Sequence, residues 1–210
     1  MHEVLISIQP MWCEKIKHII GQKGTKSIYE KTVEIRKTRP KIDTPFKCYI
    51  YETKGFYKGS GGCLFNGRGK VIGEFVCDRV QPFESEFVDD DCYENIASLD
   101  YDEDGDVTGF IEWSNDGDIP YESTHFYKKC CVKYEELKKY MGYGINQFYA
   151  WHISDLVIYD ESKELSEFCR HDNTYDNAFG HVFEDRSKQI PLSRPPQSWC
   201  YVELLKGGAE

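Results

Sequence analysis

The stretch Glu30-Lys31-Thr32-Val33-Glu34-Ile35-Arg36-Lys37-Thr38-Arg39-Pro40 decides how the fold of this chain is interpreted. Within it, two apolar residues alternate with three polar ones: Val33 and Ile35 with Thr32, Glu34 and Arg36. A period of two is typical of a half-buried β-strand. We therefore expect the apolar pair to point into a core and the polar residues to share the opposite face.

The charges around this strand allow two interpretations. Lys31, Lys37 and Arg39 crowd its two ends, and an acid beside several cations is stabilised in its charged form. One interpretation is a solvated strand face, whose surface ion pairs each contribute little to stability. The other is a binding face, on which the cations meet phosphate or the edge of a base. Spacing alone does not separate the two.

Length and composition indicate one globular domain. A chain of 210 residues with 40% hydrophobic content can bury a sizeable core, so we predict a single domain over residues 1–205 and a flexible tail over 206–210. No run approaches the roughly 18 apolar residues of a membrane span, and the first residues lack the pattern of a signal peptide. None of the nine cysteines forms a C-x-x-C pair, so we expect reduced thiols, no metal site, no cofactor and a cytoplasmic location.

The net charge of −10 is concentrated in one segment. Residues 81–127 carry 15 Asp/Glu and no Lys or Arg, whereas the rest of the chain carries 26 Lys/Arg against 21 Asp/Glu. We predict that this segment is an acidic insertion outside the core. Within it, residues 100–106 resemble the start of an EF-hand loop, but Ile111 occupies the position that needs a bidentate Glu. A solvated hairpin over 107–113 is the alternative, and a third is an acidic face that binds a basic partner protein.

Periodicity and breakers predict few helices and many strands. Strands are expected at 4–8, 31–36, 48–51, 71–80, 148–159 and 199–204. Helices are expected at 10–21 and 134–141, with a short one at 164–169. Residues 55–69 are rich in glycine and are expected to form a loop, and 170–190 are expected to be irregular. The pattern favours the α+β class, with a barrel-like sheet.

Several of these blocks resemble one family. The N-terminal strand with Ser7 and Pro10, the helix after it, the block 30–37, and the strand around Gly73-Glu74-Phe75 are similar to an ASCH domain. The segments 149–156 and 195–202 are similar to ASCH proteins of bacterial prophages. The resemblance covers residues 1–80 and 128–205, and leaves out the acidic insertion.

The resemblance implies a fold and a function. ASCH domains belong to the PUA-like superfamily, so it implies a small mixed β-barrel with flanking helices and a cleft that binds RNA or a modified nucleotide. The strand after the first helix lines that cleft in the family, which places Lys31, Glu34 and Arg36 there. One bacterial branch hydrolyses N4-acetylcytidine with a Lys, a Thr and a distant Glu. Lys31 matches the Lys, whereas Glu34 stands in the Thr position and no acid lies near residues 129–131.

Elementary chemistry is compatible with a nucleotide ligand. Glu34 can accept a hydrogen bond from an exocyclic amine, and Trp151 can stack on a base. A period of two, however, puts Trp151 and His152 on opposite strand faces, and the spacing of Lys31 and Glu34 raises the same conflict. The alternatives are a core aromatic for Trp151 and a structural role for His152. The candidate ligand-binding residues are Ser7, Lys31, Glu34, Arg36, Lys37, Arg39, Trp151 and His152.

Three functional hypotheses remain open at this stage. The first is a module that binds RNA or a modified nucleotide through the Lys31–Arg36 strand. The second is a hydrolase of a modified pyrimidine nucleoside or of RNA, with Lys31 as electrostatic stabiliser and Glu34 as proton carrier. The third is a phage protein that binds a host protein through residues 81–127. The sequence does not decide whether the chain is an enzyme.

Overall fold

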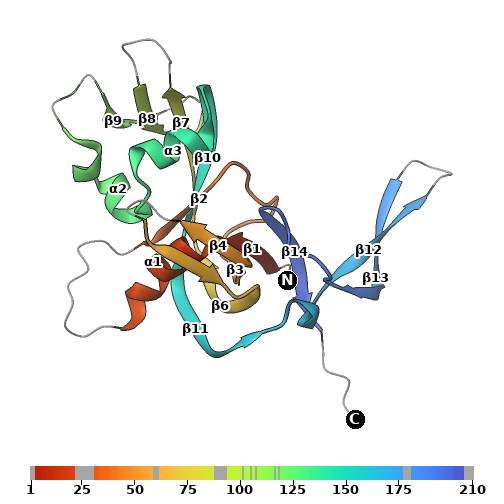
Figure 1. Ribbon diagram of the computed structural model, residues 1–210. Coiled ribbons are helices and arrows are strands. Elements are labelled where there is room, and N and C mark those ends of the chain that lie inside the picture. The colour runs from red at the N-terminus through yellow and green to blue at the C-terminus, as the bar shows by residue number, and fades with distance from the viewer. Residues whose placement is uncertain are drawn as a thin grey trace. The chain divides into compact units, whose positions relative to one another are not determined.

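The chain forms two compact units, each built around its own β-sheet (Figure 1). A computed structural model describes residues 3–21, 31–58, 62–87, 94–100, 102–104, 106, 108–115, 117, 119–176 and 181–205. The described residues of unit 1 fall within Met1–Cys13, Phe46–Phe75 and Leu156–Glu210, and those of unit 2 within Glu14–Pro45 and Val76–Asp155. The fold is mixed and rich in sheet with few helices, as expected for the α+β class.

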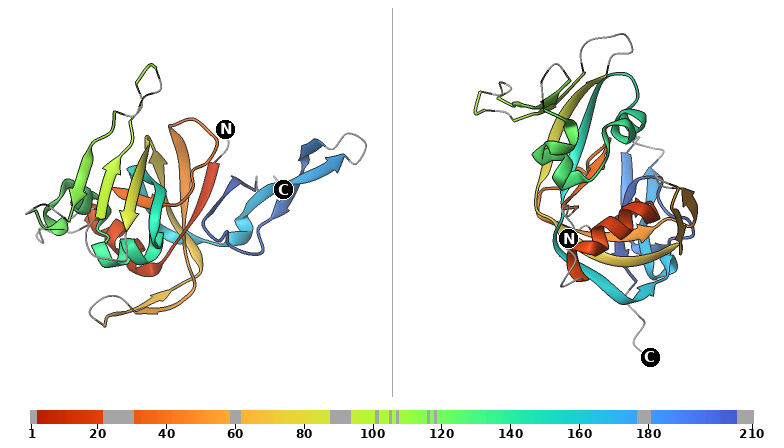
Figure 2. Two further views of the ribbon diagram at one scale, coloured as in Figure 1. Left: turned by 90° about the horizontal axis from the view of Figure 1, so that it is seen from above. Right: turned by 60° about the vertical axis from the view of Figure 1, so that its left-hand side comes forward.

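Unit 1 contains a seven-stranded sheet in the order β11-β6-β3-β1-β14-β12-β13. Its strands are β1 (Glu3–Ile8), β3 (Phe46–Glu52), β6 (Lys70–Cys77), β11 (Ser154–Lys163), β12 (Phe168–Asp176), β13 (His181–Pro191) and β14 (Trp199–Leu204). The short 3-10 helix η2 (Leu165–Glu167) precedes β12, and helix α1 (Pro10–Gly21) follows β1. A separate hairpin, β4 (Gly55–Lys58) and β5 (Leu64–Gly67), projects from this sheet in the left view of Figure 2.

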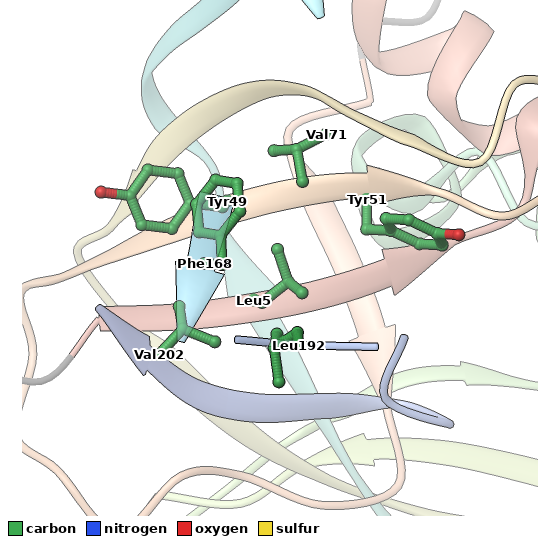
Figure 3. Packing of buried hydrophobic residues seen from close by; sticks show 7 residues of the cluster. All are labelled: Leu5, Tyr49, Tyr51, Val71, Phe168, Leu192 and Val202. Carbon is green, nitrogen blue, oxygen red and sulfur yellow. The ribbon is translucent and has the colours of Figure 1, made fainter. Parts of the chain in front are cut away.

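The core of unit 1 forms around β1, whose continuous apolar run is buried on both faces. β1 pairs in parallel with β3 and antiparallel with β14, so it lies inside the sheet. Figure 3 shows the buried cluster that results: Leu5, Tyr49, Tyr51, Val71, Phe168, Leu192 and Val202. The rings of Tyr49 and Phe168 meet edge to face, with centroids 4.8 Å apart. Residues far apart in sequence thus close one core.

Unit 2 contains a five-stranded sheet in the order β2-β10-β7-β8-β9. Its strands are β2 (Val33–Arg36), β10 (Gly144–His152), β7 (Val80–Phe87), β8 (Glu94–Ser98) and β9 (Ile111–Ser114). Its helices are η1 (Tyr121–Ser123), α2 (His125–Cys130) and α3 (Tyr134–Met141). Phe126 on α2 packs on Phe83 and Phe148 of the sheet, with ring centroids 5.0 and 6.0 Å apart. Aromatic packing therefore fixes α2 on one face.

The acidic segment is part of the core of unit 2 and not an excursion from it. It supplies β7, β8 and β9, and its apolar residues Phe83, Ile96 and Leu99 are buried. Among its described acids, Glu84 and those at 102–106 and 122 are exposed, whereas Glu86, Glu94, Asp100 and Glu112 are partly buried. The high share of acids in the composition concealed the buried apolar residues. The predicted limits of a single domain, with an insertion at 81–127, stay a prediction. The predicted tail, 206–210, lies outside the described residues.

Several predicted elements are confirmed and others are wrong. The strand at 4–8 and the helices at 10–21 and 134–141 are present. Residues 55–69, predicted as a loop, contain the hairpin β4–β5, and 170–190, predicted as irregular, contain most of β12 and β13. In both cases backbone pairing with a neighbouring strand outweighs weak local propensity.

Two predicted strands are each divided in two. The strand expected at 148–159 ends at His152, and β11 begins at Ser154 in the other sheet. Asp155 has a φ of 45°, which turns the chain at this point. The strand expected at 71–80 ends at Cys77, and Pro82 lies inside β7. Pairing between β7 and β8 begins at Phe83. Pro82 therefore lies where β7 needs no backbone N–H to pair with β8, and the missing N–H of proline is tolerated.

The described part of the chain shows neither a closed barrel nor a membrane-spanning helix. Both sheets have two open edges in their strand order. None of the helices in the described ranges combines the length and the apolar character needed to cross a bilayer. The sheet-rich fold is therefore established at the level of class, and the barrel stays a prediction.

Candidate functional site

Strand β2 is buried on both of its faces. Val33 and Ile35 lie in the core as predicted, but Glu34 and Arg36 are also only 6% and 8% exposed. The interpretation of β2 as a solvated strand face is therefore wrong. The strand's hydrogen-bonded partner is β10, and Lys37, which follows it, donates from Nζ to the carbonyl of Met141 at the end of α3 (3.2 Å).

The charged residues of this strand form a buried ion cluster of Lys31, Glu34 and Arg36. Lys31 Nζ lies 3.1 Å from Glu34 Oε2, and Arg36 Nη2 lies 3.1 Å from Glu34 Oε1. Lys31 Nζ also donates to the carbonyls of Val33 (2.9 Å) and Cys130 (2.8 Å). A single carboxylate thus neutralises two cations inside the protein, and the ammonium of Lys31 has acceptors within the chain.

The conflict in spacing between Lys31 and Glu34 disappears in the structure. β2 begins at Val33, so Lys31 precedes the strand and is not bound by its period of two. Its Nζ nevertheless lies 3.1 Å from Oε2 of the Glu34 carboxylate. The catalytic roles predicted for Lys31 and Glu34 stay predictions, and the observed contacts explain the pair as a structural link between β2 and the end of α2.

The register of β2 against β10 assigns the remaining candidates to two faces. Trp151 lies opposite Glu34, and His152 lies opposite Val33. Directly opposed residues of an antiparallel pair share one face of the sheet. Trp151 is therefore on the ion-cluster face, and His152 is on the other face. The sheet itself separates two residues that were predicted to serve one site.

Of the other predicted ligand-binding residues, Trp151 lies opposite Glu34 on the face of the ion cluster. Trp151 is fully buried, which makes it a core aromatic in this conformation. Lys37 and Arg39 are exposed beyond the end of β2, and Lys37 Nζ lies 5.3 Å from the centre of the Tyr140 ring. Ser7 belongs to unit 1, where its hydroxyl donates to the carbonyl of Pro196 (2.7 Å). The ligand-binding role of the predicted set stays a prediction.

A cavity of about 190 Å³ lies on the other face of the unit 2 sheet. Its apolar lining comes from Val33, Phe83, Phe110, Phe126 and Ala150. Its polar lining comes from Arg79, Gln81, Ser98, Asp100, Glu112, His125, Lys129 and His152. The cavity therefore combines aromatic rings with cations, carboxylates and imidazoles, all within one unit.

Gln81 organises one wall of the cavity. Its side-chain nitrogen donates to the carbonyl of Leu99 (3.0 Å) and to Asp100 Oδ1 (2.9 Å), and its side-chain oxygen accepts from Arg79 Nη2. Arg79 Nη2 also lies 3.9 Å from Asp100 Oδ1. Because the amide is held at both ends, the cation and the carboxylate keep fixed positions at the cavity wall.

Two titratable groups of the cavity have shifted pKa values. Burial lowers the pKa of His152 below its ordinary value of 6.5, and the charges of Arg79 and Lys129 lower it further. Burial raises the pKa of Glu112 above its ordinary value of 4.5, although Lys129 and His125 oppose that rise. At neutral pH His152 is therefore a neutral imidazole, with one nitrogen that donates and one that accepts.

The rim of the cavity depends on a close approach of two backbones. Ser98 N donates to the carbonyl of Phe110 (3.0 Å), and a Cβ added at Gly109 would lie 1.7 Å from the carbonyl oxygen of Ser98. Only glycine fits there without a backbone shift. The approach places the Phe110 side chain, which is 59% exposed, at the cavity.

Most cavity residues were missed because the acidic segment had been assigned to the surface. Asp100 was considered only as part of an incomplete EF-hand loop, and Glu112 only as part of a solvated hairpin. In the structure Asp102 Oδ1 accepts from the backbone nitrogens of Asp104 (3.1 Å) and Asp106 (2.8 Å), so it stabilises its own turn. No group of three potential ligands is placed to hold a metal ion among the described residues. The sequence offered no local signal for Arg79, Gln81, Phe110 or Lys129.

Comparisons with known proteins give no further identification. No protein-family model matches this chain, and neither the curated proteins nor the solved structures contain a match. The function therefore has to be argued from the cavity itself.

Proposed function

We propose that unit 2 binds the base of a nucleotide or of an RNA residue in the cavity beside β2. The observation that carries this proposal is the joint lining of one small volume by phenylalanine rings, carboxylates and cations. A volume of about 190 Å³ is below the 300–1,000 Å³ typical of drug-sized ligands, so it suits a single small ring system.

Each type of lining residue has a counterpart in a nucleotide. An exposed ring such as Phe110 offers a face on which any base can stack. The carboxylates of Asp100 and Glu112 can accept hydrogen bonds from exocyclic amines, as Asp and Glu do from cytosine N4. Arg79 and Lys129 are exposed cations at the same cavity, which suits a phosphate outside it.

The ASCH resemblance remains a proposal that this site supports. In the family the strand after the first helix lines the cleft, and here Val33 of β2 lines the cavity. The strand contributes through Val33, whereas its charged residues form the ion cluster on the other face. We likewise propose the PUA-like relationship from the sequence blocks alone.

A hydrolase is the second candidate, favoured by the two shifted pKa values. A neutral imidazole and a carboxyl with a raised pKa in one cavity are the groups that proton transfer requires. In that case His152 and Glu112 would act on the bound base, in place of the Lys31 and Glu34 pair predicted from the sequence. Binding and turnover are measured on the same samples below.

The test is calorimetric titration with ribonucleosides, including acetylated and methylated cytidines, with mass spectrometry of the recovered ligand. We expect Phe110→Ala to weaken binding roughly 5- to 150-fold, which corresponds to the loss of about 1–3 kcal/mol of stacking. Ile111→Ala is the matched control, because Ile111 is 57% exposed beside Phe110 but does not line the cavity.

Each outcome has a defined meaning. Binding with an unchanged ligand mass supports a binding module, and loss of an acetyl group supports the hydrolase. Equal affinities of wild type and Phe110→Ala, or no binding of any nucleoside, would refute the cavity as a base-binding site. A host protein bound by the acidic segment would then become the leading hypothesis.

A further inference from the structure

The hairpin β4–β5 of unit 1 presents two different faces. Its cross-strand partners are Phe56 with Asn66, Tyr57 with Phe65, and Lys58 with Leu64. Since side chains alternate along a strand, the first and third pairs share one face and the middle pair points to the other. The middle pair is half-buried, whereas all four residues of the first face are exposed.

The exposed face carries an unusual amount of apolar surface. Phe56 is 79% exposed and Leu64 is 73% exposed, the two largest values among the exposed large hydrophobic residues. They lie diagonally to one another across the hairpin, with Lys58 and Asn66 completing the four positions. A contiguous exposed patch of this kind is typical of an interaction site.

The charge of the hairpin is opposite to that of the whole chain. Residues 53–73 contain Lys54, Lys58, Arg68 and Lys70 and no Asp or Glu, although the net charge of the protein is −10. Arg68 Nε lies 3.4 Å from Glu52 Oε2, and Lys70 Nζ lies 2.7 Å from Glu164 Oε1. Within the described part of the chain, Lys54 and Lys58 pair with no carboxylate.

The hairpin is anchored at its base, so its exposed face is held in place. Thr53 N donates to the carbonyl of Ile8 (2.9 Å), and Gly69 N donates to the carbonyl of Glu52 (3.1 Å). A Cβ added at Gly67 would lie 1.8 Å from the carbonyl oxygen of Thr53 and 2.5 Å from the Pro10 ring. The backbone of β5 therefore sits directly against the start of α1.

We propose that the β4–β5 hairpin binds single-stranded nucleic acid. Phe56 stacks on a base, Lys54 and Lys58 neutralise phosphates, and Asn66 hydrogen-bonds to a base edge. The positive charge on an otherwise acidic protein favours a polyanion over an apolar protein partner, which would gain nothing from two unpaired lysines. This site lies in unit 1 and does not depend on the cavity of unit 2.

The test is fluorescence anisotropy with labelled 12-nucleotide single-stranded RNA and DNA of mixed sequence. We expect Phe56→Ala to weaken binding roughly 5- to 150-fold. We expect the double variant Lys54→Ala/Lys58→Ala to reduce the slope of log affinity against log salt by about 1.4, since each phosphate contact contributes about 0.7. Comparison of the RNA and DNA affinities shows which nucleic acid the hairpin prefers.

The controls separate this proposal from the cavity. Val157→Ala removes an exposed apolar side chain, and Lys139→Ala an exposed lysine, both outside the hairpin. Neither should change oligonucleotide affinity, and the hairpin variants should bind nucleosides as the wild type does. The proposal would be overturned if the protein bound no oligonucleotide, or if neither Phe56→Ala nor the double lysine variant changed the affinity. Either result would indicate that the patch binds a protein partner.

Discussion

The two faces of the β2–β10 pair carry the same kinds of residue, but these residues form an ion cluster on one face and line a cavity on the other. On one face, Glu34 compensates Lys31 and Arg36 in a closed cluster next to the buried Trp151. On the other face, charged and aromatic side chains surround an open volume of about 190 Å³. Charged residues in a strand therefore do not indicate a binding site by themselves; what matters is whether their partners lie within the chain.

The sharpest way to test this contrast is to remove the central charge of the ion cluster. Glu34→Gln removes the carboxylate that both Lys31 and Arg36 contact in the interior, so we expect it to lower the free energy of unfolding by about 3–5 kcal/mol. Urea denaturation measures the change. Glu14→Gln is the control, because Glu14 pairs with Lys17 at the surface and should cost at most about 1 kcal/mol.

A double variant tests whether the ion cluster acts as a unit. Lys31→Met removes one cation, and combined with Glu34→Gln it removes the whole Lys31–Glu34 pair. We expect the double variant to lose less free energy of unfolding than the sum of the losses of the two single variants. Such a difference indicates direct coupling between the two residues. Additive effects would show that the cluster is not a unit.

A substitution at the rim of the cavity should change stability less, through a backbone clash and not through a lost charge. Gly109→Ala places a Cβ 1.7 Å from the carbonyl oxygen of Ser98, so the segment that leads into β9 has to move away from the end of β8. We expect a loss of about 1–3 kcal/mol in stability, together with weaker nucleoside binding. Gly117→Ala is the control, since the nearest atom to its added Cβ is 3.6 Å away. Equal stabilities of the two variants would contradict the close approach.

The smallest effects concern the pH dependence of stability. His152 should destabilise the protein as the pH falls, and Glu112 should destabilise it as the pH rises. The pKa of His152 in the folded protein is lower than in the unfolded chain, so the unfolded state takes up a proton first as the pH falls below 6.5. Stability is therefore lost as the pH falls from 6.5 through the folded pKa. His152→Asn should lack this loss in melting temperatures measured between pH 5 and pH 7.5.

Glu112 provides the complementary measurement. Its pKa in the folded protein is raised above 4.5, so the unfolded state releases its proton first as the pH rises. Stability is lost as the pH rises through the folded pKa, and Glu112→Gln should be more stable than wild type at pH 7 and no more stable at pH 4. The same change at both pH values would mean that the carboxyl is not buried in the cavity.

The elements were predicted best where local pattern and tertiary context agree. The apolar run of β1 and the helical spacing of α1 and α3 required no partner to be recognised. The hairpins β4–β5 and β12–β13 were missed because glycine-rich and polar segments become strands only through the pairing that the fold provides. For the same reason Phe83 and Ile96 could not be distinguished from surface residues of an acidic segment.

The sequence by itself determined that the chain is a sheet-rich α+β protein and that Val33 and Ile35 are core residues, because periodicity records which face of a strand is buried. Only the tertiary structure decided what the charged residues do. Lys31 Nζ lies beside the Glu34 carboxylate and donates to the carbonyl of Cys130 on α2, and His152 and Glu112 line one cavity with residues of β7 and α2. The contact with Cys130 and the shared cavity bring together residues that are distant in sequence, and local spacing carries no information about them.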